Sequence, residues 1–571
     1  MKKTLFFLTF IFIGFSSFSQ EVKKENQTKQ DQTFWDFNRL HIQSKGKYYV
    51  DELGETDNKH GKWIYYDREG AIEEVRYYYK NMLSGSVISY FPNGQKRQEG
   101  YFKYNRQDSI FFEWYETGNL KIEGVYKMDH AFGTWKNYYR DGRLKSVEEI
   151  DGDENYMREF YIPDSLHTQT VIAGNGEMTT YYTTGTVKEW YNYKDGLKHG
   201  KFEELSVYGY PTLTGEFHEN EKHGEWSYYY YFGDKEKVSH YEKGVLHGAY
   251  QYFYDNKELN VKGSYIDGKK EGEWTWYTNQ GKRDMQGNFK EDLQHGDWTY
   301  WYPTGELSYT AHYTEDIKTG IWTYFYENGK KFKEGPYSHD LRNGEWKTWY
   351  EDETLLMVGV FKDGKEEGNW LNYWDTGDLK NQATFKAGEL DGEWLSYYPS
   401  GTQKIIGKYS ENMKVGEWTE NFENGSPKDV QTYKVFKKKS KMEYGFTKDK
   451  VTMDSKLDGH SVSYSSKDFK MTEEGDYKNG LKHGDWVAYH PGGRTPAVES
   501  TYKDGKLHGK MKQYSRRGKL LQETDYKNGL KHGKFIIYDK KGNITREIKY
   551  ENGMQIIEGS TGGSGSFTPG H

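Results

Sequence analysis

The chain has 571 residues, a formal net charge of -7 and no cysteine. Although this length exceeds what one core usually supports, about 250 to 300 residues, aromatic residues at 18% and 64 glycines beside 10 prolines indicate strands and glycine turns instead of ordinary globular domains. The acidic balance argues against a nucleic-acid partner. The lack of cysteine excludes disulfides, cysteine metal sites, a thiol nucleophile and a lipid-anchored N-terminal cysteine.

Residues 1–19 have the pattern of a secretory signal peptide. Lys2 and Lys3 precede a short apolar run, and small residues follow it before Gln20. The run is too short to span a bilayer as a permanent helix, so we expect no transmembrane segment. The leader is similar in style to those of exported Bacteroidota proteins. We therefore predict export to the periplasm or cell surface, peripheral association with the outer membrane and no lipid anchor, with residues 20–46 as a linker.

A glycine recurs every 24 residues through the middle of the chain. We call these residues frame glycines and number positions from them. The unbroken series is Gly176, Gly200, Gly224, Gly248, Gly272, Gly296, Gly320, Gly344, Gly368, Gly392 and Gly416. The same frame holds upstream at Gly61, Gly85, a degenerate Ser109 and Gly133, and downstream at Gly459, Gly484, Gly509 and Gly533. The chain therefore holds about nineteen repeat units.

Each unit reads as two strands and two turns. Position +2 is usually tryptophan, further aromatics follow, and a glycine at +9 is typical of a type I turn with a left-handed glycine. A second strand ends on an aromatic at +17, and position +20 is Gly, Asn or Asp, which tolerate the left-handed region. Such short connections force each strand to pair antiparallel with its sequence neighbour.

We thus predict an all-β fold: an elongated, twisted antiparallel β-meander or solenoid of about nineteen 24-residue hairpin repeats. Because aromatics occupy odd and even positions, we expect both sheet faces to bury rings between repeats. The tryptophans at position +2 are predicted to have a structural role in the repeats. They are Trp226, Trp274, Trp298, Trp322, Trp346, Trp370, Trp394 and Trp418.

Two intervals between frame glycines, 133 to 176 and 416 to 459, are 43 residues long. Each is interpreted as a normal unit followed by an irregular insert or a decayed repeat. The predicted boundaries are repeats at 47–156, 176–435 and 459–558, inserts at 157–175 and 436–458, the second one basic, and a disordered Gly/Ser tail at 559–571. Partner contacts are expected where the array is irregular. The candidates are Tyr156, Phe160, Tyr161, Lys437, Lys438 and Lys439.

The unit G-x-W-x-x-Y-Y-x-x-x-G followed by Y-K-D-G-K-x-H-G resembles the MORN repeat superfamily, and more closely its bacterial YwqK-type variant. The resemblance extends from about Lys47 to Glu558 and is clearest between Gly224 and Gly416. It implies an elongated antiparallel sheet. It also implies a role as an interaction scaffold, a phospholipid-binding module or an antitoxin, although an export signal does not suit the last role.

No catalytic or metal motif is recognised, and we predict a non-enzymatic protein without cofactor. Histidine often precedes the frame glycine, but neighbouring ones would lie about 10 Å apart, so a hydrogen bond in the turn is the preferred role. These residues are His60, His199, His223, His247, His295, His483, His508 and His532. The leading hypothesis is an envelope protein–protein interaction scaffold, such as an accessory subunit of an outer-membrane assembly. The alternatives are a glycan or cell-wall binding module using rows of aromatic rings, lipid binding, and antitoxin-like neutralisation of a partner.

Overall fold

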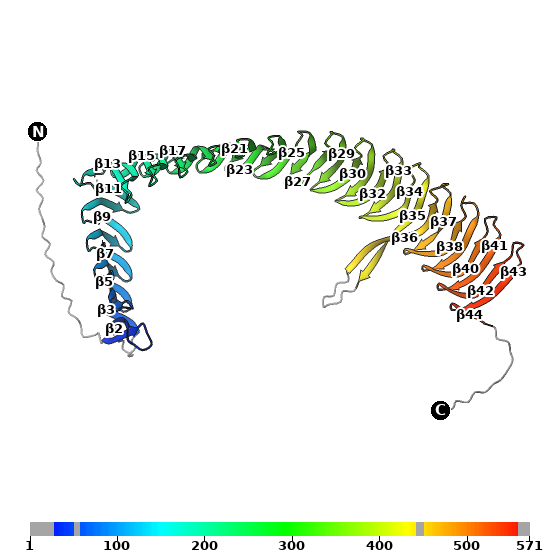
Figure 1. Ribbon diagram of the computed structural model, residues 1–571, viewed down its shortest axis with the longest axis horizontal. Helices are drawn as coiled ribbons and strands as arrows, with labels where there is room; N and C mark the ends of the chain where they lie inside the picture. Colours follow the sequence, from blue (N-terminus) through cyan, green and yellow to red (C-terminus); the bar gives the residue numbers. More distant parts are fainter. Residues whose placement is uncertain (1–27, 51–56, 441–449, 558–571) are drawn as a thin grey trace, which may run out of the picture. The chain divides into compact units, whose positions relative to one another are not determined.

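The structure, a computed structural model, describes residues 28–50, 57–440 and 450–557 (Figure 1). The chain divides into two compact units, residues 1–257 and 258–571. In the described ranges both units consist of strands and turns without an α-helix, and thus none with the length and apolar character to cross a membrane. The predicted leader at 1–19 and the predicted tail at 559–571 lie outside the described residues.

The described residues of unit 1 form nineteen strands, most of eight or nine residues. They are β1 (Thr28–Phe34), β2 (Ile42–Tyr49), β3 (Asn58–Tyr66), β4 (Ile72–Tyr79), β5 (Met82–Tyr90), β6 (Lys96–Lys103), β7 (Arg106–Trp114), β8 (Leu120–Lys127), β9 (His130–Tyr138), β10 (Leu144–Asp151), β11 (Glu154–Tyr161), β12 (Gln169–Ile172), β13 (Asn175–Tyr181), β14 (Val187–Lys194), β15 (Leu197–Leu205), β16 (Pro211–His218), β17 (Glu221–Tyr229), β18 (Lys235–Glu242) and β19 (Val245–Phe253).

The described residues of unit 2 likewise form strands joined by turns. They are β20 (Leu259–Ile266), β21 (Lys269–Tyr277), β22 (Arg283–Lys290), β23 (Leu293–Trp301), β24 (Leu307–Thr314), β25 (Ile317–Phe325), β26 (Lys331–Ser338), β27 (Leu341–Arg342), β28 (Gly344–Trp349), β29 (Leu355–Lys362), β30 (Lys365–Tyr373), β31 (Leu379–Lys386), β32 (Glu389–Tyr397), β33 (Gln403–Ser410), β34 (Met413–Asn421), β35 (Pro427–Ser440), β36 (Lys450–Tyr464), β37 (Met471–Lys478), β38 (Leu481–Tyr489), β39 (Pro496–Lys503), β40 (Lys506–Tyr514), β41 (Leu520–Lys527), β42 (Leu530–Tyr538), β43 (Ile544–Glu551) and β44 (Met554–Ile556).

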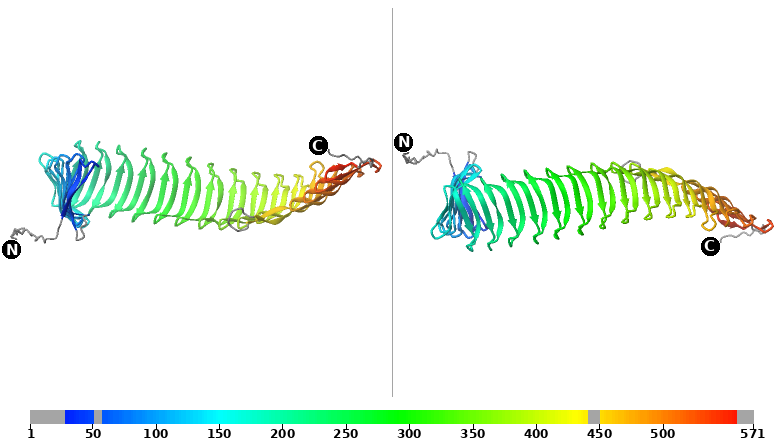
Figure 2. Two further views of the ribbon diagram at one scale, coloured as in Figure 1. Left: turned by 90° about the horizontal axis from the view of Figure 1, so that it is seen from below. Right: turned by 90° about the horizontal axis from the view of Figure 1, so that it is seen from above.

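Within each unit the strands pair antiparallel in chain order, so the predicted all-β meander of hairpin repeats is confirmed (Figures 1 and 2). One repeat corresponds to one hairpin. In the hairpin of β23 and β24, Gly296 lies opposite Tyr313 and Trp298 opposite Ala311. The aromatic residue at +17 therefore lies opposite the frame glycine of the same repeat, as expected from the 24-residue spacing.

Both predicted turns are present. In the turn after β23, Gly305 has a φ of 101° and donates its N–H to the carbonyl of Tyr302 at 2.8 Å, which fits a left-handed glycine closing a type I turn. In the turn after β22, Glu291 and Asp292 have φ values of 52° and 72°, as in a type I′ turn. The carboxylate of Asp292 also accepts the N–H of Lys270 at 2.7 Å, which links neighbouring turns along one sheet edge.

The tryptophans at +2 form a row on one face of the sheet, which we call the tryptophan face. Trp298 is 1% exposed because it lies flat on Gly287 of the preceding strand, where a Cβ atom would overlap the indole. The ring of Phe289 packs edge-on to it at 5.2 Å. This nearest-neighbour packing replaces a separate core layer.

A cation two positions before the frame glycine covers many of these rings. Lys222 Nζ, for example, lies 4.3 Å from the ring centroid of Trp226 and 5.1 Å from that of Tyr241. The residues that cover a ring in this way are Lys59, Lys222, Lys270, Lys318, Arg342, Lys414, Lys482 and Lys531.

The opposite face, which we call the outer face, differs from expectation. Its rings, such as Trp301 and Trp349, are only half-buried, so deep burial of rings on both faces is not observed. No small partner residue opens space for them as Gly287 does for Trp298. Ring burial is thus concentrated on the tryptophan face.

Two of the predicted segments, the linker and the second insert, need correction, whereas the first insert fits the interpretation as a decayed repeat. The predicted linker forms β1 and β2 from residue 28 onward. The first insert is a shortened hairpin, because β11 pairs with the four-residue β12. The second insert is regular: β35 and β36 pair in register out to Ser440 and Lys450, and their hairpin projects beyond the neighbouring turns (Figure 1). The two intervals of equal length thus form different hairpins, one shortened and one extended. The spacing of the frame glycines alone does not predict which of the two forms.

Candidate functional site

An exposed apolar cluster, the outer patch, lies on four neighbouring strands of the outer face in unit 1. It consists of Tyr101 on β6, Ile110 on β7, Val125 on β8 and Phe132 on β9. Val125 lies directly opposite both Ile110 and Phe132 in the antiparallel register. Tyr101, Ile110 and Phe132 are 41%, 45% and 47% exposed, respectively. The patch is therefore continuous across the strands and open to solvent.

The outer patch departs from what other repeats place at the same positions. Ile110 occupies position +1, where most regular repeats have charged side chains such as Glu225, although Ile321 stands there in one of them. Phe132 occupies position -1, where His223 stands in a regular repeat. Because charged residues are depleted from interface centres while aromatic residues are enriched there, this change of residue type is typical of a binding surface.

Two turns beside the outer patch carry large apolar residues in the left-handed region. Tyr104 has a φ of 52° and Met128 a φ of 53°, and both side chains are exposed. The corresponding residue in a regular unit is Glu291. Because Glu291 has the same left-handed backbone, with a φ of 52°, only the exposed apolar side chains distinguish these two turns from a regular one.

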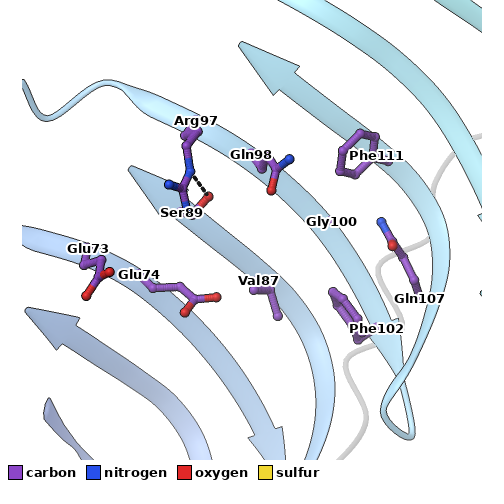
Figure 3. Close-up of a pocket in the computed structure, with 10 residues that line it drawn as sticks. All are labelled: Glu73, Glu74, Val87, Ser89, Arg97, Gln98, Gly100, Phe102, Gln107 and Phe111. Carbon is purple, nitrogen blue, oxygen red and sulfur yellow. Dashed lines mark hydrogen bonds between the residues drawn. The ribbon is translucent and has the colours of Figure 1, made fainter. Parts of the chain in front are cut away.

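On β4 to β7, a hollow of about 200 Å³ opens on the tryptophan face where Val87 replaces the row tryptophan (Figure 3). Ser89 and Gln107 line it, and Arg97 Nε donates to Ser89 Oγ at 3.3 Å. Glu74 at its rim pairs with Arg76 at 2.6 Å. The loss of one indole therefore leaves a mostly polar depression.

A second hollow, of about 400 Å³, lies on the tryptophan face at the shortened hairpin. We call it the insert hollow, and it is lined by Glu148, Asn155, Met157, Met178, Glu189, Tyr191, Tyr193, Lys198 and Asn220. Met178 occupies the tryptophan position of its repeat. Here β11 reaches past the short β12–β13 turn, and the N–H of Met157 donates to the carbonyl of Gly196 at 2.8 Å.

The carboxylates of the insert hollow are held by neutral donors. Glu148 accepts hydrogen bonds from Asn137 and Asn155 at 3.0 and 2.8 Å. Glu189 accepts one from the hydroxyl of Tyr191 at 2.8 Å. In the part of the chain that the structure describes, neither carboxylate has an ion pair within 4.0 Å. Glu189 interacts electrostatically with Lys198, although the two form no ion pair, so Glu148 is the less compensated of the two carboxylates.

Lys198 forms one wall of the insert hollow. Its Nζ lies 4.1 Å from the ring centroid of Tyr191 and 5.3 Å from that of Phe217. Burial lowers the pKa of Lys198 below the ordinary lysine value. Burial also raises the pKa of Tyr193, whose hydroxyl points to the sulfur of Met178 at 3.8 Å. The wall of the hollow is thus aromatic and poorly hydrated.

The structure separates the residues predicted for partner contacts. Phe160 is 1% exposed and packs with Met157 and Val171, so its prediction as a contact residue was wrong. Tyr156 and Tyr161 are half-buried beside the same hairpin. Lys437 on β35 is exposed, whereas the side chains of Lys438 and Lys439 lie outside the described residues. The outer patch and the insert hollow were missed. Only the outer patch had a signal in the aligned repeats, namely apolar residues at positions that are usually charged or polar.

The predicted turn hydrogen bond is present at two of the eight histidines, His508 and His532, whereas the buried Nδ1 atoms of His60 and His295 have no hydrogen-bond partner among the described residues. The N–H of Asn528 donates to His508 Nδ1 and that of Asn552 to His532 Nδ1, both at 3.4 Å. In residues 28–50, 57–440 and 450–557 no group of three or more metal-ligand side chains could hold an ion.

Antiparallel hairpins in chain order, with one ring row and local departures, define a β-hairpin repeat protein. The family profile described as MORN repeat variant matches eight segments: residues 83–104, 107–128, 246–267, 294–315, 318–339, 366–387, 507–528 and 531–552. The chain is a MORN-repeat protein.

Comparisons with other proteins add little. No curated protein matches the chain. Two solved structures, described as "Crystal Structure of TcdB2-TccC3-Cdc42" and "Crystal Structure of TcdB2-TccC3 without hypervariable C-terminal region", align with 10% identity and TM-scores of 0.13 and 0.14. The alignments cover 92% of this chain but 31% and 30% of those chains. Similarity at this level carries no argument about fold or function.

Proposed function

We propose that this chain is a non-enzymatic scaffold that binds a protein partner of the cell envelope through the outer patch. The observation that carries the proposal is the replacement of charged or polar residues by Ile110 and Phe132 on an exposed, continuous surface. Contiguous exposed apolar surface commonly marks a protein interface. The envelope location comes from the leader pattern of residues 1–19, and an accessory subunit of an outer-membrane assembly is the form that we favour.

The test is affinity purification of the tagged, full-length protein from native membranes. The test variant combines Ile110→Glu and Phe132→His, which restores the residue types of regular repeats and should leave the hairpins folded. The control, Ile321→Glu, changes a 62% exposed isoleucine at the same repeat position in unit 2. We expect a stoichiometric protein to co-purify with the wild type and the control but not with the double variant. Equal recovery by all three, or recovery of no protein, would overturn the proposal.

Glycan binding is the second candidate. Its support is the hollow in Figure 3, where the amides of Gln98 and Gln107 lie beside the rings of Phe102 and Phe111. The row tryptophans offer no stacking platform because they are buried. Retention of a sugar without any co-purifying protein would favour this candidate. Lipid binding and antitoxin-like neutralisation are further alternatives, and the former predicts salt-sensitive pelleting with anionic vesicles.

A further inference from the structure

We propose that the insert hollow binds the cationic side chain of a lysine or arginine from a polypeptide partner. The inference rests on the proposed function in one respect, namely that the cation belongs to a protein. It adds a site separate from the outer patch, on the opposite face of the sheet and on different strands. The argument comes from how the chain fills the equivalent space in its own regular repeats.

In a regular repeat, the cation two positions before the frame glycine occupies a space between the +2 and +17 rings. Lys270 Nζ lies 4.9 Å from the ring centroids of both Trp274 and Phe289. Lys414 lies 4.2 Å from Trp418 in the same arrangement. The fold therefore uses an ammonium or guanidinium group over aromatic faces as a standard packing element.

The repeat that begins at Gly176 lacks this cation. The residue two positions earlier is Gly174, which lies in the turn before β13, a strand of only seven residues. Position +2 is Met178 and position +17 is Tyr193. Thus one aromatic wall is present, but the lysine is absent and the indole is replaced by a smaller, polarisable thioether.

Charge complementarity identifies the missing occupant. Glu148 and Glu189 line the insert hollow and have only neutral hydrogen-bond donors in the described structure, namely Asn137, Asn155, Ser146, Thr180 and Tyr191. Their two negative charges exceed the single positive charge of Lys198, which already lies over Tyr191. An added cation would gain both carboxylates and the ring of Tyr193, whereas an anion would meet their repulsion.

The hollow also has the size and rigidity that such a site needs. Its volume of about 400 Å³ exceeds that of one long side chain. Backbone hydrogen bonds from Met157 to Gly196, from Gly196 to Gly174 and from Gly174 to Arg158, of 2.8 to 2.9 Å, connect β11, which carries Met157, to the two neighbouring turns. A partner side chain would therefore enter a preformed cavity, which lowers the entropic cost of binding.

The test uses saturation-transfer NMR with the full chain and two small probes. The probes are N-acetyl-lysine N-methylamide and the same compound with its ε-amine acetylated. We expect the charged probe to receive saturation along its side chain and the neutral probe to receive almost none. The variant that combines Glu148→Gln and Glu189→Gln should bind the charged probe about tenfold more weakly or worse. Glu225→Gln, an exposed carboxylate on the outer face, is the matched control and should bind as the wild type does.

A second variant keeps the test decisive if the double variant unfolds. Met178→Lys supplies the ammonium group from within the chain and should abolish probe binding while circular dichroism shows an unchanged fold. Equal binding of both probes, or full binding by a folded double variant or by Met178→Lys, would overturn the inference. The outcomes separate the two proposals: a partner recovered equally by wild type and the Glu148/Glu189 variant would refute this site and leave the scaffold. Binding of the charged probe without recovery of any partner protein would support this site and refute the proposed scaffold function.

Discussion

Trp298 lies flat against the backbone of Gly287 on the neighbouring strand, so that a single added Cβ atom would overlap its indole. Where the neighbouring position is serine or threonine, the ring is smaller: Ser239 lies opposite Tyr250, and Thr524 opposite Phe535. Alanine is accommodated beside tryptophan in other repeats, as Ala383 is opposite Trp394. The two positions therefore share a limited volume, and size complementarity between consecutive repeats stabilises the row.

Gly287→Ala tests this packing. The added methyl group forces the indole of Trp298 or its strand to shift, and we expect a loss of about 1–3 kcal/mol in local stability. The measurement is urea unfolding together with hydrogen exchange of β22 and β23. Ala311→Gly is the control, since the same repeat position there already holds a methyl group beside Trp322. It should cost about 1 kcal/mol or less, and a Gly287→Ala protein as stable as the wild type would contradict the packing.

Trp322→Ala should be more damaging. Trp322 is 4% exposed and packs against Tyr313 and Tyr337 with centroid distances of 5.3 and 5.1 Å. Removal leaves a cavity with an expected cost of about 3–5 kcal/mol. Because packing is between neighbours, hydrogen exchange should accelerate in β24 to β26 and not in distant repeats. Unchanged thermal unfolding would show that the row does not stabilise the hairpins.

Tyr302→Phe removes one hydrogen bond from a series of tyrosine hydrogen bonds that connect consecutive repeats, which we call the tyrosine ladder. The hydroxyl of Tyr302 donates to the carbonyl of Phe325, one repeat further on, at 2.7 Å. The same bond recurs in other units, for example from Tyr326 to Trp349 at 2.8 Å. We expect a loss of about 1 kcal/mol in the urea unfolding free energy. Tyr104→Phe, in an exposed turn, should have no effect on stability, and equal effects of the two changes would argue against the ladder.

Alkaline pH should destabilise the protein through its tyrosines. Burial raises the pKa of Tyr300 and of Tyr139 to about 12, against an ordinary value of 10.0. The folded state thus favours the neutral hydroxyl, so its contribution to stability is complete below pH 10 and is lost as the pH rises through about 12. The melting temperature should fall over this window, with tyrosinate absorbance rising in parallel. A melting temperature that stays constant to pH 12 would contradict this environment.

The sequence predicted the hairpins well because their determinants are local. The left-handed positions of Gly305 and Asp292 follow from residue type, and their spacing sets the pairing. Prediction from the sequence failed where contacts between elements determine the structure. Burial of Phe160 depends on which face of β11 meets β12, and the regular extension of β35 and β36 depends on pairing across a basic segment.

The candidate sites were less accessible to prediction. Ile110 and Phe132 could have been found as apolar residues at positions that regular repeats fill with Glu225 or His223. The insert hollow could not, because the absence of a covering cation at Gly174 has meaning only once the position of Lys270 over its rings is known.

The most direct test of the account is hydrogen exchange of the full chain before and after it captures its partner from envelope extracts. If binding occurs where the repeat is broken, new protection should be confined to the outer patch on β6 to β9 and to the insert hollow on β10 to β15. Protection spread over the regular repeats of unit 2, with none at these strands, would contradict it.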